Sequence, residues 1–321
     1  MPALLPNSRL CRLATCAIFL QAFSAAMADG PPPAKAKPAD IYDRQADGEK
    51  QIATALAEAK RDHKRVLLQF GANWCGWCHK LNNLFKTNKD IKETLSYEFV
   101  VVHVDVDKVD GKQHNEKVNA KYGNPMKLGL PALVVLDEDG KQVVTQETGS
   151  LEKGDAHDPL KVLGFLKQWQ AKAPTADEVL GAALTRAKLE SKAVFVDFSA
   201  PWCVWCRVLD EYLHRPEIAT VFEAGIIPVK IDIDRFKGGK EMCAKMGGGS
   251  SGIPFYVMLD SAGSPIGTSI PPGGKNSGFP GTPEEIQYFI SLVKKAAPKT
   301  TDAQAKVLED GFAKKPAKTG H

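Results

Sequence analysis

Apolar and polar residues follow the same order twice along the chain. Each copy opens with apolar residues spaced for one face of a helix: Ile52, Leu56 and Ala59, and later Val179, Ala182 and Leu184. A short apolar run follows each helix, at residues 66–70 and 193–198, and runs of this length suit a buried strand. The pattern therefore predicts two copies of one helix–strand unit.

The shared order continues to the end of each copy. A further helix is predicted to close near Lys86 or His214, and a second apolar strand follows at 99–106 or 226–233. A polar helix, a Gly-x-Pro junction, a strand hairpin and a final helix come next. The hairpins are expected at 132–136 with 142–145 and at 255–259 with 265–268, and the final helices at 159–170 and 283–295. This order predicts an α/β fold with two tandem domains, each a central mixed β-sheet flanked by helices.

Sequence identity supports the repeat. Residues 66–85 align without a gap on residues 194–213, and the shared residues include two Trp-Cys pairs in each copy: Trp74-Cys75 and Trp77-Cys78, and Trp202-Cys203 and Trp205-Cys206. Similarity at a fixed period indicates repeated structural units. We expect domain 1 at 45–172, domain 2 at 173–298 and a polar C-terminal tail at 299–321.

The first residues have the features of a cleavable secretion signal. Arg9 and Arg12 precede an uncharged, mostly apolar run, and Ala26-Met27-Ala28 offers a small-x-small cleavage site. The run is shorter than the roughly 20 residues that span a bilayer. We expect a signal peptide at 1–28, a flexible linker at 29–44, and a periplasmic or secreted protein without stable membrane insertion.

Charge gives little indication of a macromolecular partner. The formal net charge is +4, and charges of both signs are interspersed along the chain. Bulk electrostatics therefore does not favour nucleic-acid binding. No sequence feature points to oligomerisation, so we expect a monomer.

Cysteine usage points to chemistry rather than to a structural scaffold. Removal of the signal peptide would leave Cys75 and Cys78, Cys203 and Cys206, and the single Cys243. Two close pairs within large domains differ from the dense disulfide framework of small secreted proteins. Cys243 lies between two methionines in a predicted helix and is expected to be a buried apolar residue.

Together these motifs resemble the thioredoxin superfamily in both copies. The shared features are a strand, Trp-Cys-x-x-Cys and a helix, followed by Gly-x-Pro and a hairpin. The second copy also resembles the periplasmic thioredoxin-like domains of thiol:disulfide interchange proteins, through residues 200–206 and 215–218. The resemblance implies a thiol-disulfide oxidoreductase of the protein-disulfide reductase or isomerase type that needs no cofactor. Its partners would be protein thiols and disulfides and a separate membrane or periplasmic electron donor.

The spacing of each cysteine pair suits this reaction. A nucleophilic cysteine must be a thiolate, and a free thiol has a pKa of about 8.5. At the first turn of a helix, Cys75 and Cys203 would gain the unpaired N–H groups and positive dipole end that stabilise an anion. Cys78 and Cys206, three residues later, would lie close enough to resolve a mixed disulfide.

The resemblance also implies a substrate-binding rim around each pair. Pro131 and Pro254 would be cis, and the residues before them, Leu130 and Ile253, would offer their backbones to a substrate chain. The same rim would include the tryptophans of the two motifs, Trp74, Trp77, Trp202 and Trp205.

The copies differ at one position that bears on proton transfer. In thioredoxins, an acidic residue six positions before the first cysteine is buried and handles the proton of the resolving cysteine. Asp197 has this place in domain 2, within an apolar strand that should raise its pKa. Domain 1 carries Gln69 there, and we therefore expect domain 2 to exchange disulfides faster.

Other interpretations of the cysteines remain open. Cys75 to His79 form a C-x-x-C-H haem-attachment motif, although the second copy has Arg207 in place of the histidine. Zinc held by the four cysteines, Cu(I) held by a reduced pair, and a non-catalytic interaction module are further alternatives. Neither pair contains the proline of reducing thioredoxins or the histidine of oxidising family members. The missing histidine argues against a strong oxidant, and the direction of the reaction stays open at the level of sequence. A Gly/Pro-rich loop at 271–281, which domain 1 lacks, is expected to shape the choice of partner.

Overall fold

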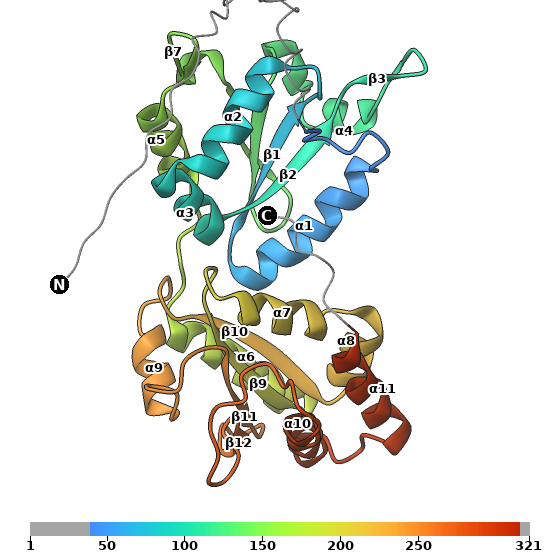
Figure 1. Ribbon diagram of the computed structural model, residues 1–321, viewed down its shortest axis with the longest axis vertical. Helices are drawn as coiled ribbons and strands as arrows, with labels where there is room; N and C mark the ends of the chain where they lie inside the picture. The colour runs from blue at the N-terminus through green and yellow to red at the C-terminus, as the bar shows by residue number, and fades with distance from the viewer. Residues whose placement is uncertain (1–38, 315–321) are drawn as a thin grey trace, which may run out of the picture. The chain divides into compact units, whose positions relative to one another are not determined.

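The structure, a computed structural model, describes residues 39–314. The predicted signal peptide and the first ten residues of the predicted linker therefore lie outside the described residues. Two four-stranded sheets form the centres of the two domains, with the strand orders β2-β1-β5-β6 and β10-β9-β11-β12 (Figure 1). The predicted α/β class with two mixed sheets is confirmed.

The sheet of domain 1 is built around one fully buried strand. β1 (Arg65–Gly71) pairs in parallel with β2 (Phe99–Asp105) and antiparallel with β5 (Ala132–Leu136), which pairs with β6 (Gln142–Glu147). Helices cover both faces of β1, and its residues from Val66 to Phe70 are accordingly apolar except for Gln69.

Alternate residues of β1 face two separate layers of helices. Leu68 and Phe70 pack with α1 (Gly48–Asp62) and α4 (Glu116–Lys121). Leu67 packs on the opposite face with three helices: α2 (Gly76–Thr87), α3 (Lys89–Glu98) and α5 (Pro159–Trp169). The period-2 alternation of a strand thus divides the core of domain 1 into two layers.

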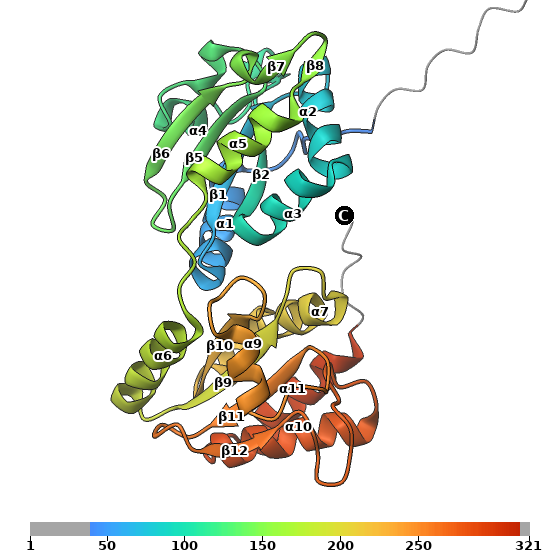
Figure 2. The ribbon, with the colours of Figure 1, turned by 90° about the vertical axis from the view of Figure 1, so that its left-hand side faces the viewer.

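Short elements complete domain 1. They are the strands β3 (Lys108–Val109), β4 (Lys112–Gln113), β7 (Glu152–Lys153) and β8 (Ala156–His157), and the 3-10 helices η1 (Pro125–Leu128) and η2 (Gly149–Leu151). The β7–β8 hairpin lies beside α2 (Figure 2).

Domain 2 repeats this plan with its own strands. β9 (Ala193–Ser199) pairs in parallel with β10 (Ile226–Asp232) and antiparallel with β11 (Phe255–Leu259), which pairs with β12 (Pro265–Thr268). One face of the sheet packs on α6 (Ala176–Glu190) and α9 (Gly239–Lys245). The other packs on four helices: α7 (Val204–Leu213), α8 (Pro216–Phe222), α10 (Pro283–Ala296) and α11 (Asp302–Ala313).

The structure corrects two sequence expectations in domain 2. Residues 299–321 were expected to form a polar tail, yet α11 packs against α8 and α10 through its buried residues Ala305, Leu308 and Phe312 (Figure 2). Many lysines and acids in this segment conceal an apolar face of helical period. In α6, the predicted face is partly wrong, because Ala182 is exposed and Ala183 is buried.

Among residues 39–314, no helix has both the length and the hydropathy of a membrane span.

Candidate active site

Each cysteine pair begins a helix, as the spacing predicts. Cys75 is the N-cap residue of α2 and Cys203 that of α7, and each Sγ accepts a hydrogen bond from the backbone N–H three residues later at 3.1 Å. The pairs are closed as disulfides with S–S distances of 2.16 and 2.14 Å. The helix N-terminus and this N–H group both favour a thiolate on the first cysteine once the bond is reduced.

The two sulfurs of each pair differ in exposure. The first cysteines, Cys75 and Cys203, each retain 5% exposure, while Cys78 is fully buried and Cys206 is 1% exposed. The first cysteine of each pair is therefore the one that retains contact with the surface. This asymmetry is the one expected of a pair in which the first cysteine attacks and the second resolves.

An exposed tryptophan directly precedes the first cysteine of each disulfide. Trp74 donates from its indole Nε1 to Asp107 at 2.9 Å, and Trp202 donates to Asp234 at 2.7 Å. Both rings remain largely exposed, at 69% and 61%. Each aspartate follows the second strand of its domain and thereby holds an apolar ring in a fixed place at the rim.

The proline junctions meet the cysteines, as the resemblance predicts. The Leu130–Pro131 and Ile253–Pro254 peptide bonds are both cis. In domain 2, Cys203 Sγ lies 3.5 Å from the carbonyl oxygen of Ile253. In domain 1, Leu130 packs against the cluster that contains Cys75 and Cys78. The residue before each cis-proline, Leu130 or Ile253, thus lies beside the cysteine pair of its domain.

The second tryptophans of the two motifs have different surroundings. Trp77 makes an edge contact with His157 of β8, with ring centroids 5.2 Å apart, and Lys80 Nζ lies 4.2 Å from its ring centroid. Trp205 is instead 60% exposed and stacks on Phe279, with centroids 6.0 Å apart. The two domains therefore present different surfaces beside otherwise similar disulfides.

A carboxyl group lies buried in the central strand of domain 2. Asp197 is 4% exposed, and its Oδ1 has no hydrogen-bond partner among the described residues. Burial raises the pKa of Asp197 to about 7, while the positive charge of Lys230 opposes the increase. Lys230 is the register partner of Asp197 on β10 and forms an ion pair with Asp210 at 2.9 Å.

The same position in domain 1 is uncharged. Gln69 is fully buried and pairs in register with His103, whose pKa burial lowers to about 4. The histidine is therefore neutral near pH 7. Gln69 Nε2 donates a hydrogen bond of 2.7 Å to the hydroxyl of Tyr42.

Tyr42 is a site residue that the sequence pattern did not reveal. It lies in the predicted flexible linker, yet it is 2% exposed and packs with Cys75 and Cys78, which corrects the expectation for this part of the linker. A Cβ added at Gly71 would collide with the Tyr42 hydroxyl and lie 2.7 Å from Cys78 Sγ, so glycine leaves room for both groups. The Tyr42 hydroxyl and Cys78 Sγ thus both lie close to Gly71.

Asn73 fixes the backbone of the Tyr42 segment beside the disulfide. Its Oδ1 accepts hydrogen bonds from the N–H groups of Ile41 and Tyr42, at 2.8 and 2.9 Å, and its Nδ2 donates to the Tyr42 carbonyl. These contacts span more than 30 residues of sequence. A side chain two residues before Cys75 therefore anchors the segment that supplies the hydroxyl.

The remaining candidate residues have structural surroundings of their own. His79 Nε2 lies 2.8 Å from the carbonyl oxygen of Asn73 and helps to hold the loop before Cys75. Cys243 is buried, as predicted, and burial raises its pKa. Within residues 39–314, no three His, Cys, Asp or Glu side chains gather as a metal-binding group.

Several proteins with disulfide chemistry in their names are similar to this chain. The disulfide bond reductase DsbH of Chlamydia pneumoniae is 32% identical over 97 residues, which cover 28% of this chain and 57% of the relative. Protein disulfide-isomerase 1 of Dictyostelium discoideum is 28% identical over 186 residues, which cover 57% of this chain and 48% of the relative. The chain thus spans about half the length of these curated relatives.

One solved structure is similar in sequence to part of this chain. A disulphide isomerase from Xylella fastidiosa Temecula1 is 35% identical, with a TM-score of 0.36, and the match covers 40% of this chain and 95% of that one.

Two family models match the two domains separately. A thioredoxin-like domain model matches residues 52–161, and a second thioredoxin-like model matches residues 175–261. Each matched range contains one helix-capping cysteine pair and one cis-proline junction. The chain therefore belongs to the thioredoxin superfamily, as two thioredoxin-like domains in tandem.

Proposed function

We propose that this protein is a thiol-disulfide oxidoreductase of the reductase or isomerase type, which acts on disulfides of other proteins through both cysteine pairs. The observation that carries the proposal is the asymmetry of each pair. The cysteine that retains some exposure caps a helix, and its more deeply buried partner lies within disulfide distance to resolve the intermediate. The names of the similar proteins agree with this reaction type.

The reaction in domain 2 begins with the reduced pair. The Cys203 thiolate attacks one sulfur of a substrate disulfide, a mixed disulfide forms, and the other substrate sulfur leaves as a thiolate. Cys206 then attacks Cys203 Sγ while its proton passes to Asp197, and the second substrate sulfur leaves. Two electrons pass from the protein to the substrate, and the two thiolates take protons from water. A separate dithiol donor must then reduce the Cys203–Cys206 bond.

Asp197 would serve as the proton acceptor because its pKa lies close to neutrality. A carboxyl group with a pKa of about 7 is half ionised at pH 7 and can accept the resolving cysteine's proton within the buried site. Domain 1 has no carboxylate at this position and would transfer the proton more slowly. Stopped-flow exchange on chains with one intact pair should show a faster domain 2, and Gln69→Asp should accelerate domain 1. An unchanged domain 1 rate would contradict the assigned role of the acid.

The setting of this reaction is proposed from the sequence. Residues 1–28 would direct export and be cleaved, and the monomeric mature protein would meet protein thiols and a membrane or periplasmic electron donor. N-terminal sequencing of the exported protein tests the cleavage site. A mature protein that still begins at Met1 would contradict it.

The reduction potential of each pair tests the proposed reaction. Each pair is titrated in graded glutathione or dithiothreitol buffers, with the cysteines of the other domain changed to serine. We expect values nearer to the roughly −270 mV of thioredoxin than to the roughly −120 mV of a strong disulfide donor. A value near the latter would make the protein an oxidant, and two pairs that do not titrate reversibly would exclude the proposal.

A further inference from the structure

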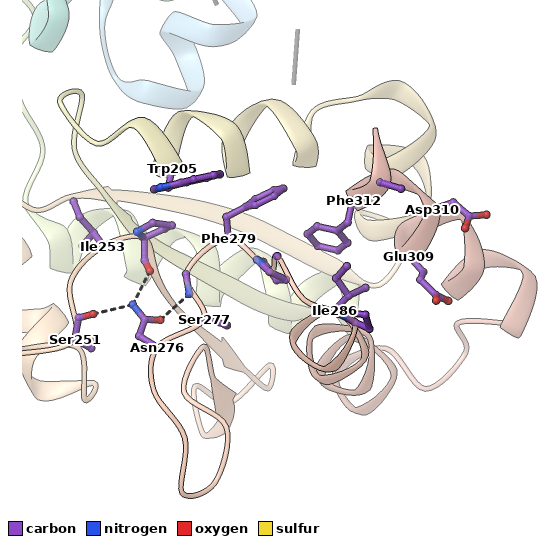
Figure 3. Close-up of a pocket in the computed structure, with 16 residues that line it drawn as sticks. Trp205, Ser251, Ile253, Asn276, Ser277, Phe279, Ile286, Glu309, Asp310 and Phe312 are labelled. Carbon is purple, nitrogen blue, oxygen red and sulfur yellow. Dashed lines mark hydrogen bonds between the residues drawn. The ribbon is translucent and has the colours of Figure 1, made fainter. Parts of the chain in front are cut away.

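A groove in domain 2 extends from the predicted substrate-binding rim beside the Cys203 pair to α11. Its cavity volume is about 730 Å³. Trp205 and the cis-proline segment form the end near the disulfide, the loop at 276–281 forms one wall, and α11 forms the far end (Figure 3). We call this feature the Phe279 groove.

A row of aromatic rings lines the groove. Trp205 stacks on Phe279 with an interplanar angle of 17°, and Phe279 contacts Phe312 of α11 with centroids 5.4 Å apart (Figure 3). Trp205 remains 60% exposed despite this contact. Aromatic side chains contribute large apolar contact areas to binding sites, so this row can take up an apolar side chain of a partner.

The groove is shaped by fixed contacts rather than by a free loop. Asn276 Nδ2 lies 3.1 Å from the carbonyl oxygens of Ser251 and Gly252 and 3.0 Å from that of Pro254. This amide joins the loop to the cis-proline segment of the active site. A wall held in this way is already in place before a partner binds, which lowers the cost of binding.

The charges along the groove have one sign. Glu309 and Asp310 lie at its α11 end, and among residues 39–314 no lysine, arginine or histidine lines the groove (Figure 3). Asp310 forms an ion pair with Lys306, whereas no ion pair of Glu309 is present within residues 39–314. The groove therefore complements a partner that combines apolar and basic side chains.

We propose that the Phe279 groove binds the polypeptide segment that flanks the reacting cysteine of a protein substrate. A phenylalanine-sized side chain next to that cysteine would lie against Trp205 and Phe279, and a lysine or arginine a few residues further along would pair with Glu309. The inference rests on the proposed function and adds a substrate class to it: disulfide-bonded proteins whose cysteine lies in an aromatic, basic sequence.

Exchange kinetics with defined peptides test this preference. The full chain carries Cys75→Ser and Cys78→Ser, so that only domain 2 reacts. Its reduced form is mixed with peptides whose single cysteine is joined to glutathione, and peptide release is followed by chromatography. The peptides carry Phe or Ala beside the cysteine and Lys or Gln further along. We expect the Phe/Lys peptide to react about tenfold faster than the Ala/Gln peptide.

Two substitutions divide this preference into its parts. Phe279→Ala should remove the preference for Phe over Ala, and Glu309→Gln should remove the preference for Lys over Gln while that for Phe stays. Because Phe279→Ala could loosen the contact with Phe312, Phe279→Leu serves as a second, better-packed variant. Val307→Ala, on α11 outside the groove lining, is the matched control. Unchanged peptide ratios in both groove variants would overturn the inference.

The design keeps failure of the inference distinct from failure of the proposed function. Glutathione disulfide has no side chain to fill the groove, and its reaction rate normalises each variant. A chain that reduces it without distinguishing the peptides retains the proposed function and loses only the inference. A chain that reduces neither loses both.

Two other occupants would overturn the inference in a recognisable way. A dimer in sedimentation that Phe279→Ala dissociates would assign the groove to a second copy of this chain. A gain of peptide rate upon deletion of residues 315–321 would assign it to the chain's own basic end. We expect a monomer and no gain.

Discussion

Gln69 and Asp197 have the same place in their two sheets, so domain 2 has a buried carboxyl group where domain 1 has an amide. Asp197 pairs in register with a lysine, whereas Gln69 pairs with a neutral histidine and donates to a tyrosine. Burial opposes the charged form of Asp197, so the carboxyl group affects the stability of domain 2 as well as its chemistry.

We predict that Asp197 lowers the stability of domain 2 as the pH rises. Its pKa is about 7 in the folded protein, above the value of about 3.9 of a free side chain. Below pH 4 the carboxyl group is protonated in both the folded and the unfolded state, so it does not lower the free energy of unfolding. Between these values the unfolded state releases its proton first, so the free energy of unfolding falls until about pH 7 and then stays low.

Asp197→Asn should therefore raise the free energy of unfolding of domain 2 at pH 8 by roughly 2–4 kcal/mol, and by much less at pH 4. Urea titrations of the oxidised protein at both pH values measure this difference. Domain 1, which carries Gln69, provides the comparison within the same molecule. Equal effects at the two pH values would contradict the prediction.

Tyr42 contributes a different kind of group to domain 1. Burial raises its pKa, so the hydroxyl stays protonated, and Gln69 Nε2 already donates to its oxygen. We infer that its own proton can be donated toward Cys78 Sγ after reduction, because both groups lie beside Gly71. A donor of this kind favours the reduced pair.

Tyr42→Phe should make the reduction potential of the Cys75–Cys78 pair more negative by roughly 20–60 mV, the equivalent of one hydrogen bond. The Cys203–Cys206 pair of the same molecule is the control and should keep its potential. Glutathione titration followed by mass spectrometry of the alkylated thiols reports both pairs together. A parallel change in both pairs would indicate a general structural effect instead.

At the scale of elements, α11 joins the core of domain 2 instead of forming a tail. Tyr212 donates its hydroxyl to the carbonyl of Leu308 at 2.8 Å, and Arg215 donates to that of Gly311 at 2.7 Å. Phe312 stacks on Tyr212 with ring centroids 4.0 Å apart. The last helix therefore satisfies two buried or half-buried polar groups and covers an aromatic face.

Phe312→Ala should destabilise domain 2 by about 3 kcal/mol, because it removes a buried ring from the core. Val307→Ala, at an exposed position of the same helix, should change the stability by less than about 0.5 kcal/mol. Thermal unfolding of both variants makes the comparison. Similar effects of the two substitutions would mean that α11 contributes little to the core.

At the scale of the whole molecule, the two domains carry similar disulfides, but only domain 2 has a buried carboxyl group, Asp197, in its central strand. The exchange rate of domain 2 should rise with a midpoint near pH 7, as Asp197 ionises, while domain 1 should lack this step. Rates measured from pH 5 to pH 9, on chains with only one pair intact, test this difference. The same midpoint in both domains would exclude Asp197 as its source.

Much of this fold follows from the sequence pattern. The central strands are apolar runs that a single residue interrupts, Gln69 or Asp197, and the hairpins and cysteine helices begin and end close to their predicted residues. The roles of Tyr42 and Phe279 could not be predicted from the sequence. Both residues lie in stretches without periodicity, and their contacts join segments that are distant in sequence. The buried face of α11 could not be predicted either, because its few apolar residues lie among many charged ones.

The walls of the Phe279 groove come from segments that carry none of the sulfur or proton-transfer groups. Loop 276–281 and α11 lie after the last strand of the sheet, and loops tolerate insertion and substitution better than the elements they join. Apart from Trp205 and the cis-proline segment, the residues that would select a partner are thus encoded in other stretches of the gene than the reactive groups. An engineer could exchange the final stretch to redirect the protein toward new clients, and natural drift could do the same, with the redox centre untouched.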